Sequence, residues 1–539
     1  MKSRLRHGRI NSLWTFVFGG TLAVILLTMM LRWGGPQPEG VGNRLTIYCA
    51  AGLRAPLEQV AERYQQEYGI TIDVQYGGSN TLLNQLEIDK FSDVDLYLAA
   101  DDLYTDAARE KGLAAEVLPI AYQRPVIAVQ QGNPKNITSF EDLLSDQVVL
   151  ALPDPDHAAA GRVARERLSA ATDGQQSLWD RLEQHVVEGR RGVFKPTIND
   201  VAADIKLGSV DAGIVWDSTT AMPSFRDELE AVFLPELAGP PNLVSICVLN
   251  SSRRPTSALR FARYVSASDR GLPSFEEFGL APIEGDVWAE RPEITFFCGA
   301  VSRRAMESII EEFEKREGCV VNTIYDGCGI LTSRMQTIEA QSQAQGFPDV
   351  YMACDLYYLE NVKDWFQEAA NVSNAEIVIA VPKGSTKVTS LSDLVKPGIR
   401  VAVGEPDQCT IGALTRRLMV KEGLYDALKE KQQQDGEVVV EKSSSALLVP
   451  DVVTGHVDAA VAYITDVMAN RDDVDVVRIE SSLNMAIQPL SIARTSRHKH
   501  LIRRLFQRIA DSPDAFEDAG FQFRLDELPL VEAMESRAP

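Results

Sequence analysis

The sequence predicts an α/β protein made of two tandem copies of one module. Segment 45–52 (LTIYCAAG) recurs as segment 294–301 (ITFFCGAV), and each copy is a short apolar run that stops at small residues. After it, strand-like runs alternate with helical patterns, which is typical of βαβ units and a largely parallel sheet. We therefore expect two α/β modules, at 44–281 and 293–525.

The two copies align along most of their length, which makes the duplication specific. In each copy the first strand is followed by apolar residues spaced i, i+3, i+4, i+7, the pattern of a helix with one buried face. Later segments also match: 95–101 with 349–355, and 211–216 with 458–463. The helical residues are Leu57, Val60, Ala61 and Tyr64 in the first copy and Met306, Ile309, Ile310 and Phe313 in the second.

The composition is that of a folded, acidic protein, with 45% hydrophobic residues and a net charge of −22 over 539 residues. The acidity argues against nucleic acid as a partner, because phosphate contacts need clustered Lys and Arg and no basic stripe is present. The sequence has no nucleotide-binding P-loop, no His-Glu-x-x-His and no Gly-x-Ser-x-Gly motif. We expect neither an enzyme nor a cofactor.

Residues 1–33 are predicted to form a cytoplasmic stub and a single transmembrane anchor in the cell inner membrane. Basic residues within 1–9 precede a charge-free run, 10–31, which at about 1.5 Å per residue spans the ~30 Å hydrocarbon core as a helix. The basic flank places residues 34–539 on the extracytoplasmic (periplasmic) side. A cleaved signal peptide is the alternative, although no clear small-x-small cleavage site follows the apolar run. Residues 34–43, rich in Pro and Gly, form a tether.

In sheets of this class, ligands bind beyond the carboxyl ends of the strands. In the first module the segments 49–54, 77–81, 153–161 and 197–216 lie there. Residues 282–292 are predicted to be a linker and residues 526–539 a loose tail. The strand-like runs of the first module are Thr71–Tyr76, Val94–Ala99, Val126–Gln130, Val148–Leu152 and Ala212–Trp216.

At these segments both modules resemble the periplasmic molybdate-binding proteins of ABC transporters, in the type 2 periplasmic-binding-protein superfamily. The family's Ala-Ala-Ser-Leu turn looks like Ala50-Ala-Gly-Leu53, and its Ser-Ser-Ser-Thr-Leu turn looks like Gly78-Ser-Asn-Thr-Leu82. Its Asp-Pro-x-x-x-x-Ala-Gly segment is similar to 154–161, and its Gly-Ile-Val-Tyr strand to Gly213-Ile-Val-Trp216. The resemblance covers nearly all of both modules.

The resemblance implies two lobes per module that close on a small oxyanion of the molybdate or tungstate type, for delivery to separate ABC permease and ATPase subunits. Helix N-termini and small-residue turns suit an anion, because they present backbone N–H groups and the positive end of the helix dipole. Gly52 replaces a family serine and Trp216 a tyrosine, so another oxyanion or a metal is the alternative ligand. The implied contact residues of the first module are Gly52, Ser79, Ala160, Ile198 and Trp216.

The second module departs further from the family pattern. Its corresponding positions keep the tyrosine but lose both serines, and a cysteine stands in place of the second serine. They are Val301, Cys328, Ile411, Ser445 and Tyr463.

Four of the seven cysteines fall on segments that the repeat places around the second cleft. In an oxidising compartment we expect one or two disulfides that brace the cleft. Buried reduced thiols are one alternative, and a four-thiolate metal site or redox module is the other. The spacing does not decide between them, because no Cys-x-x-Cys pair exists. These cysteines are Cys298, Cys328, Cys354 and Cys409.

Overall fold

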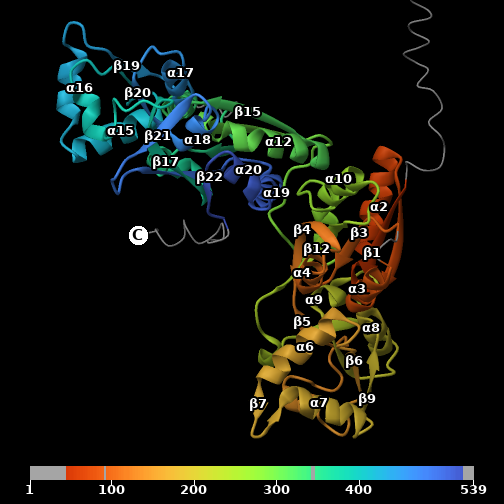
Figure 1. The fold of residues 1–539 in the computed structure, drawn as a ribbon. Helices are drawn as coiled ribbons and strands as arrows, with labels where there is room; N and C mark the ends of the chain where they lie inside the picture. The colour runs from red at the N-terminus through yellow and green to blue at the C-terminus, as the bar shows by residue number, and fades with distance from the viewer. Residues whose placement is uncertain (1–43, 90–92, 342–345, 526–539) are drawn as a thin grey trace, which may run out of the picture.

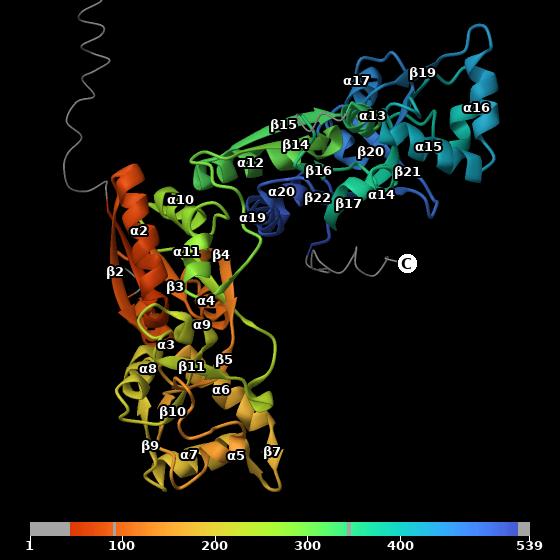
Figure 2. The ribbon, with the colours of Figure 1, turned by 180° about the vertical axis from the view of Figure 1, so that it is seen from behind.

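The computed structural model describes residues 44–89, 93–341 and 346–525. The predicted anchor and tether (1–43) and the predicted tail (526–539) lie outside these residues. Among the helices of the described ranges, none has the length and apolar character needed to cross a membrane. The two modules form separate bodies that meet at one end of each, as Figures 1 and 2 show from opposite sides.

The first module has two lobes, each with its own sheet and flanking helices. The first-lobe sheet has the order β13-β4-β12-β3-β1-β2, and β1 pairs in parallel with β2 and β3. Its strands are β1 Arg44–Ala50, β2 Thr71–Gly77, β3 Leu96–Ala99, β4 Ala114–Gln123, β12 Asn242–Leu249 and β13 Ala281–Pro282. Its helices are η1 Ala51–Leu53, α2 Arg54–Tyr68, α3 Ser79–Ile88, α4 Asp102–Glu110, α10 Pro255–Val265 and α11 Leu272–Glu277.

The second lobe of this module is built on a five-stranded sheet of order β11-β5-β10-β6-β9. The strands are β5 Pro125–Gln130, β6 Leu150–Pro153, β9 Gly192–Lys195, β10 Ala212–Trp216 and β11 Leu229–Val232, with a small hairpin of β7 Thr172–Asp173 and β8 Gln176–Ser177. The helices are α5 Phe140–Leu143, α6 Ala159–Ala170, α7 Leu178–Val187, α8 Ile198–Lys206, α9 Asp217–Ala221 and η2 Pro235–Leu237. The chain crosses between the lobes from β4 to β5 and returns from β11 to β12.

The second module repeats this plan, but one 17-residue strand, β17 Phe366–Pro382, runs through both lobes. It replaces the broken pair β4 and β5 and so joins the two lobe sheets into one. The first lobe contains β14 Glu293–Gly299, η3 Ala300–Ser302, α12 Arg303–Glu317, β15 Val320–Asp326, α13 Cys328–Ala340, β16 Val350–Met352, α14 Leu356–Glu360, η4 Lys363–Trp365, β22 Met485–Ala493, α19 Lys499–Ala510, α20 Pro513–Asp518 and β23 Gln522–Phe523. The second lobe contains η5 Leu391–Val395, β18 Val401–Gly404, α15 Thr410–Lys421, α16 Tyr425–Gln432, β19 Val439–Lys442, η6 Ser445–Leu447, α17 Leu448–Val453, β20 Ala459–Tyr463, α18 Ile464–Met468 and β21 Val474–Arg478.

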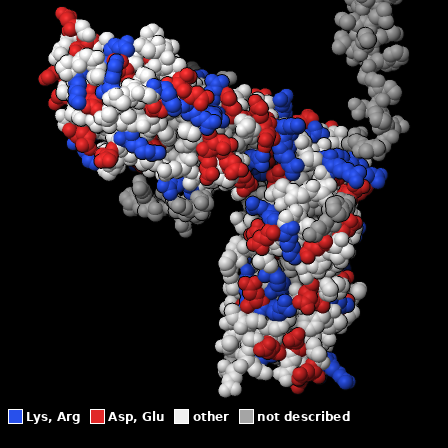
Figure 3. Space-filling view, in the orientation of Figure 1, with Lys and Arg blue, Asp and Glu red and all other residues white. Residues whose placement is uncertain are grey.

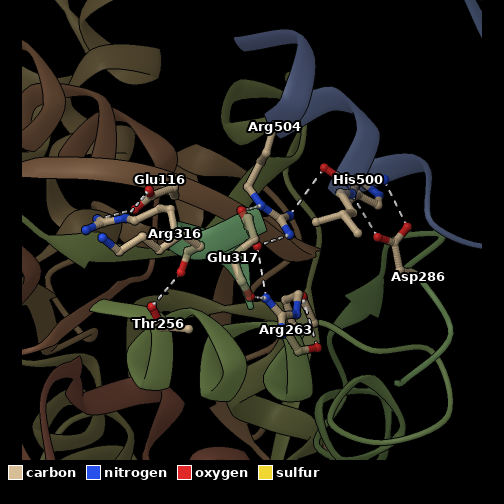
Figure 4. Close-up of polar contacts among 11 residues, drawn as sticks. Glu116, Thr256, Arg263, Asp286, Arg316, Glu317, His500 and Arg504 are labelled. Carbon is tan, nitrogen blue, oxygen red and sulfur yellow. Dashed lines mark hydrogen bonds and ion pairs between the residues drawn. The ribbon is translucent and has the colours of Figure 1, made fainter. Parts of the chain in front are cut away.

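The modules are joined through their first lobes by buried charge. Helix α10 of the first module packs against α12 of the second, and Glu317 at the end of α12 is almost fully buried between two arginines (Figure 4). Its carboxylate lies 2.9 Å from Arg263 of α10 and 2.6 Å from Arg504 of α19. Burial alone would raise the pKa of Glu317, but the two guanidinium groups outweigh it and lower the pKa.

The predicted linker forms part of this junction. The carboxylate of Asp286 accepts hydrogen bonds from the backbone N–H groups of His500 and Leu501, both at 2.9 Å, and so caps the start of α19. The indole of Trp288 donates to the Tyr68 hydroxyl of the first module at 2.9 Å. Segment 282–292 therefore bonds to both modules.

Charged residues of both signs are intermixed over the face shown in Figure 3. A cavity of about 670 Å³ lies at the junction, and neither predicted cleft contributes to its lining. Each of the three glutamates that line it is paired with a lining arginine, for example Glu116 with Arg316 at 2.7 Å. This cavity is therefore not the site to which the sequence points.

Candidate functional site

The predicted cleft of the first module forms a small cavity between its lobes. The first lobe contributes the η1 turn and the start of α3, and the second lobe contributes the starts of α6 and α8 together with Trp216. Gly52, Ser79, Ile198 and Trp216 all line the cavity, as the resemblance implies. Ala160 is fully buried one residue beyond the lining residues Ala158 and Ala159. The structure therefore brings four of the five implied residues around one cavity and places the fifth directly behind it.

The lining consists largely of helix starts. Helices α3 and α6 begin after Gly78 and Ala158, neither of which caps its helix with a side chain, whereas α8 is capped by the Thr197 hydroxyl. A helix start without a capping side chain leaves backbone N–H groups of its first turn available to a ligand. Because α3 and α6 come from opposite lobes, an anion held between them would be bound by both.

Two lining residues carry a hydroxyl group, Thr197 and Ser79. The Thr197 hydroxyl donates to the Asp200 carboxylate at 2.6 Å, which leaves the Ser79 hydroxyl for a ligand. The Ser79 hydroxyl accepts a hydrogen bond from the N–H of Ala100 at 3.3 Å, so its own proton is available for donation.

At Gly52, the side chain of Ile198 from the second lobe fills the cavity. A Cβ atom added at Gly52 would lie 2.6 Å from Cδ1 of Ile198. The loss of the family serine here therefore goes together with a bulky apolar contact across the cleft.

Polar contacts between the lobes hold the first module closed, and three of them flank the cavity. Arg162 of α6 bonds to the carboxylate of Asp101 in the first lobe at 2.8 Å, and Asp101 is almost fully buried. The Asn80 amide donates to the carbonyl of Asp156 at 2.7 Å, and the Asn199 amide donates to the carbonyl of Ala51 at 2.8 Å. The cavity that remains measures about 20 Å³, which is room for about one water molecule. A tetrahedral oxyanion therefore needs the lobes to part slightly.

The corresponding residues of the second module are all buried or nearly so. Tyr463 is 1% exposed, and its hydroxyl has no hydrogen-bond partner among the residues that the structure describes. Ser445 begins η6, which packs against the η3 turn that contains Val301. A cavity of about 320 Å³ lies beside Val301 and extends to the carboxyl side chain of Asp466. Burial raises the pKa of Asp466 to about 7, although a hydrogen bond from Ser445 lowers it in part.

The four-cysteine metal site is not formed. Within the described ranges, no three His, Cys, Asp or Glu side chains gather where they could hold a metal ion. The thiol of Cys298 faces the carbonyl of Gly299, and the thiol of Cys409 faces the carbonyls of Glu405 and Lys442. Only Cys328 and Cys354 come together, with their sulfur atoms 2.6 Å apart. All seven cysteines are buried free thiols, so the expected bracing disulfides are not formed in this structure either.

The sequence model of the family described as "Bacterial extracellular solute-binding protein" matches residues 45–281 and again residues 294–522. The chain belongs to this family. The two matches coincide with the two modules, so this solute-binding protein is a tandem duplication of the family unit.

Relatives of this solute-binding protein include single-module proteins named for molybdate. The molybdate-binding protein ModA of Mycobacterium bovis is 24% identical over 277 residues, which are 50% of this chain and 98% of that protein. The ModA protein of Escherichia coli is 26% identical over 213 residues, 38% of this chain and 75% of that protein. The solved periplasmic molybdate-binding protein of Azotobacter vinelandii matches at 14% identity with a TM-score of 0.37, covering 44% of this chain and 98% of that one.

Two features of the clefts were missed by sequence reasoning. The pair between Arg162 and Asp101 joins the lobes, and no local sequence pattern indicates it. Asp101 also caps α4, because its carboxylate accepts from the N–H of Leu103 at 3.1 Å. Asp466 was missed altogether. Its signal was the helix that follows Tyr463, where a carboxyl group stands three residues after the cleft tyrosine.

Proposed function

We propose that the first module captures a tetrahedral oxyanion of the molybdate or tungstate type by lobe closure, without covalent chemistry, for delivery to an ABC permease and its ATPase. The observation that carries this proposal is the small cavity between the lobes, which is lined by helix starts from both of them. Donors there are backbone N–H groups and the Ser79 hydroxyl, which suit an anion with several acceptor oxygens and need no Lys or Arg. Relatives named as molybdate-binding proteins support this choice of ligand.

The same proposal includes attachment to the membrane. Residues 1–33 combine a basic flank with a long apolar run, and we infer that they anchor the modules on the extracytoplasmic side of the inner membrane. A membrane-bound chain that resists extraction by alkaline carbonate would support the anchor. Recovery of a shortened, freely soluble chain would instead indicate a cleaved signal peptide.

The test is a titration of the full chain with molybdate, tungstate, sulfate and phosphate. Trp216 lines the cavity, so its fluorescence should change on binding. At about 100 times its dissociation constant, a ligand adds about 2.7 kcal/mol to the stability of the module, which should raise its unfolding midpoint by several degrees.

A matched pair of variants assigns the signal to one module. Ser79→Ala removes the cavity hydroxyl whose proton is free and should weaken molybdate binding at least about tenfold, the effect of one lost hydrogen bond to a charged group. Cys328→Ala changes the equivalent position of the second module and should leave molybdate binding unchanged. Equal loss in both variants, or no response of the wild-type chain to any of the four oxyanions, would refute the proposal.

A further inference from the structure

Comparison of the two modules shows three linked substitutions at one place in the second cleft. Ala50, Ser79 and Ala100 of the first module correspond to Gly299, Cys328 and Cys354 of the second. In the first module the Ala100 N–H donates to the Ser79 hydroxyl oxygen at 3.3 Å, and in the second the Cys354 N–H donates to the Cys328 sulfur at 3.0 Å. The backbone geometry is therefore kept while two thiols replace a hydroxyl and a methyl group.

The glycine makes room for the thiol pair. A Cβ atom added at Gly299 would lie 2.3 Å from the Cys354 sulfur and 3.0 Å from the Cys328 sulfur. Alanine, which the first module has at this position, could not be accommodated beside the two sulfur atoms. The three substitutions thus form one arrangement, in which Gly299 is required by Cys328 and Cys354.

Polar groups from both lobes surround the pair. The hydroxyls of Tyr351 and of Thr410 lie beside Cys328, are buried, and have no hydrogen-bond partner in the described part of the chain. Thr410 begins α15 in the second lobe, so the pair faces the cleft. Burial alone would raise the pKa of Cys328, but the hydrogen bonds from Cys354, together with the nearby Thr410 and Tyr351 hydroxyls, lower it. The hydrogen bond to Cys328 and burial raise the pKa of Cys354.

We propose that Cys328 and Cys354 form a redox-active dithiol that is converted reversibly to a disulfide by a thiol–disulfide oxidant. The Cys328 thiolate attacks one sulfur of the oxidant's disulfide and releases the other sulfur as a thiol, leaving a mixed disulfide. Cys354 then gives up its proton and attacks the Cys328 sulfur, which releases the second thiol. Two cysteine thiols are oxidised, one disulfide is reduced, and the two protons end on the released thiols.

The location of the pair makes this reaction depend on lobe opening. Cys328 is 0% exposed and Cys354 5% exposed in the closed arrangement, so an oxidant reaches them only when the second lobe moves away. The disulfide would also remove the S–H donor at the position where the first module has its anion-binding serine. The second cleft is thus a redox site, and this holds whichever solute the first module takes.

The test uses the full chain equilibrated with mixtures of reduced and oxidised glutathione, quenched with acid, unfolded and labelled with N-ethylmaleimide. The oxidised sample should contain Cys328 linked to Cys354 and unlabelled, while the other five cysteines carry label. Cys319 lies on the same tryptic peptide as Cys328, which ends at Arg334. The Cys319→Ser variant removes this ambiguity and should retain the link.

Two outcomes overturn the proposal. One is full labelling of Cys328 and Cys354 after oxidation of the wild-type chain, and the other is a link from either of them to Cys298 or Cys409. Gly299→Ala provides an independent check, since the added methyl group should shift the glutathione ratio at half-oxidation at least tenfold. The matched change Ala50→Gly in the first module should leave that ratio unchanged.

Discussion

Replacing Glu317 by glutamine tests whether buried charge holds the two modules together. The Glu317 side chain is 1% exposed, and its arginine partners, Arg263 and Arg504, are 9% and 10% exposed. Glutamine keeps the shape but leaves two buried guanidinium groups without a counter-charge. Removal of one partner from a buried ion pair costs about 3–5 kcal/mol. We expect unfolding to begin at the junction and its midpoint to fall by roughly 10 °C.

The assay is thermal and urea unfolding of the full chain, followed by tryptophan fluorescence, because Trp288 packs at the junction against Tyr264. The dependence on pH gives a second readout. The pKa of Glu317 is lowered from its ordinary value of 4.5, so its stabilisation is complete above that value and is lost as the pH falls through the lower folded pKa. The difference between wild type and Glu317→Gln should therefore shrink in acid.

The matched control is Glu312→Gln, because Glu312 also lies on α12 and forms a surface ion pair with Arg508 of α19. Both of these side chains are largely exposed, and exposed pairs contribute about 0–1 kcal/mol. If Glu317→Gln destabilises the chain no more than Glu312→Gln does, the buried network does not hold the junction and the reasoning fails.

Three further predictions concern the clefts. Arg162→Ala removes the ion pair between the lobes of the first module and should weaken oxyanion binding about tenfold in a calorimetric titration, an effect of about 1.4 kcal/mol. The control Arg165→Ala removes an exposed ion pair and should change the dissociation constant less than twofold. Gly52→Ala places a methyl group 2.6 Å from Ile198 and should destabilise the closed cleft by about 1–3 kcal/mol in a thermal melt. Adding Ile198→Ala should restore this stability. If it does not, the two residues are not in contact across the cleft. Asp466→Asn removes a carboxyl group whose pKa in the folded state is raised to about 7. The wild type therefore loses stability as the pH rises from about 4 to 7. At pH 8 the variant should be more stable than the wild type by on the order of 2–4 kcal/mol, whereas at pH 4 it should not be.

Much of the fold could be predicted because the strands around the clefts have clear apolar patterns, continuous in β5 and β10 and alternating with polar residues in β2. The predicted Thr71–Tyr76, Val126–Gln130 and Ala212–Trp216 differ from β2, β5 and β10 by no more than one residue at either end. The crossover strands β4 and β12 were missed. β4 contains Pro119, at a point where its pairing with β12 shifts register, and such prolines weaken the strand signal.

Only those site residues could be predicted whose place follows from the backbone, that is, from where each strand ends. Gly52, Ser79 and Trp216 follow strand ends that the resemblance locates. The contacts that depend on how the lobes close, such as Arg162 with Asp101, join residues far apart in sequence and leave no local pattern. Likewise, the repeat predicts four cysteines around the second cleft. Which of them come into contact depends on the direction of their side chains, and of the four only Cys328 and Cys354 have their sulfur atoms in contact.

The junction between the modules has a consequence for how the chain would respond to its ligands. Helices α10, α12 and α19 all belong to first lobes, and the second lobes lie away from this contact (Figure 2). Each second lobe can therefore move without disturbing the junction. Coupling between two sites requires an element whose state both sites change, and the junction is not such an element. Occupancy of one cleft should leave the isotherm of the other unchanged, with a Hill coefficient of about 1.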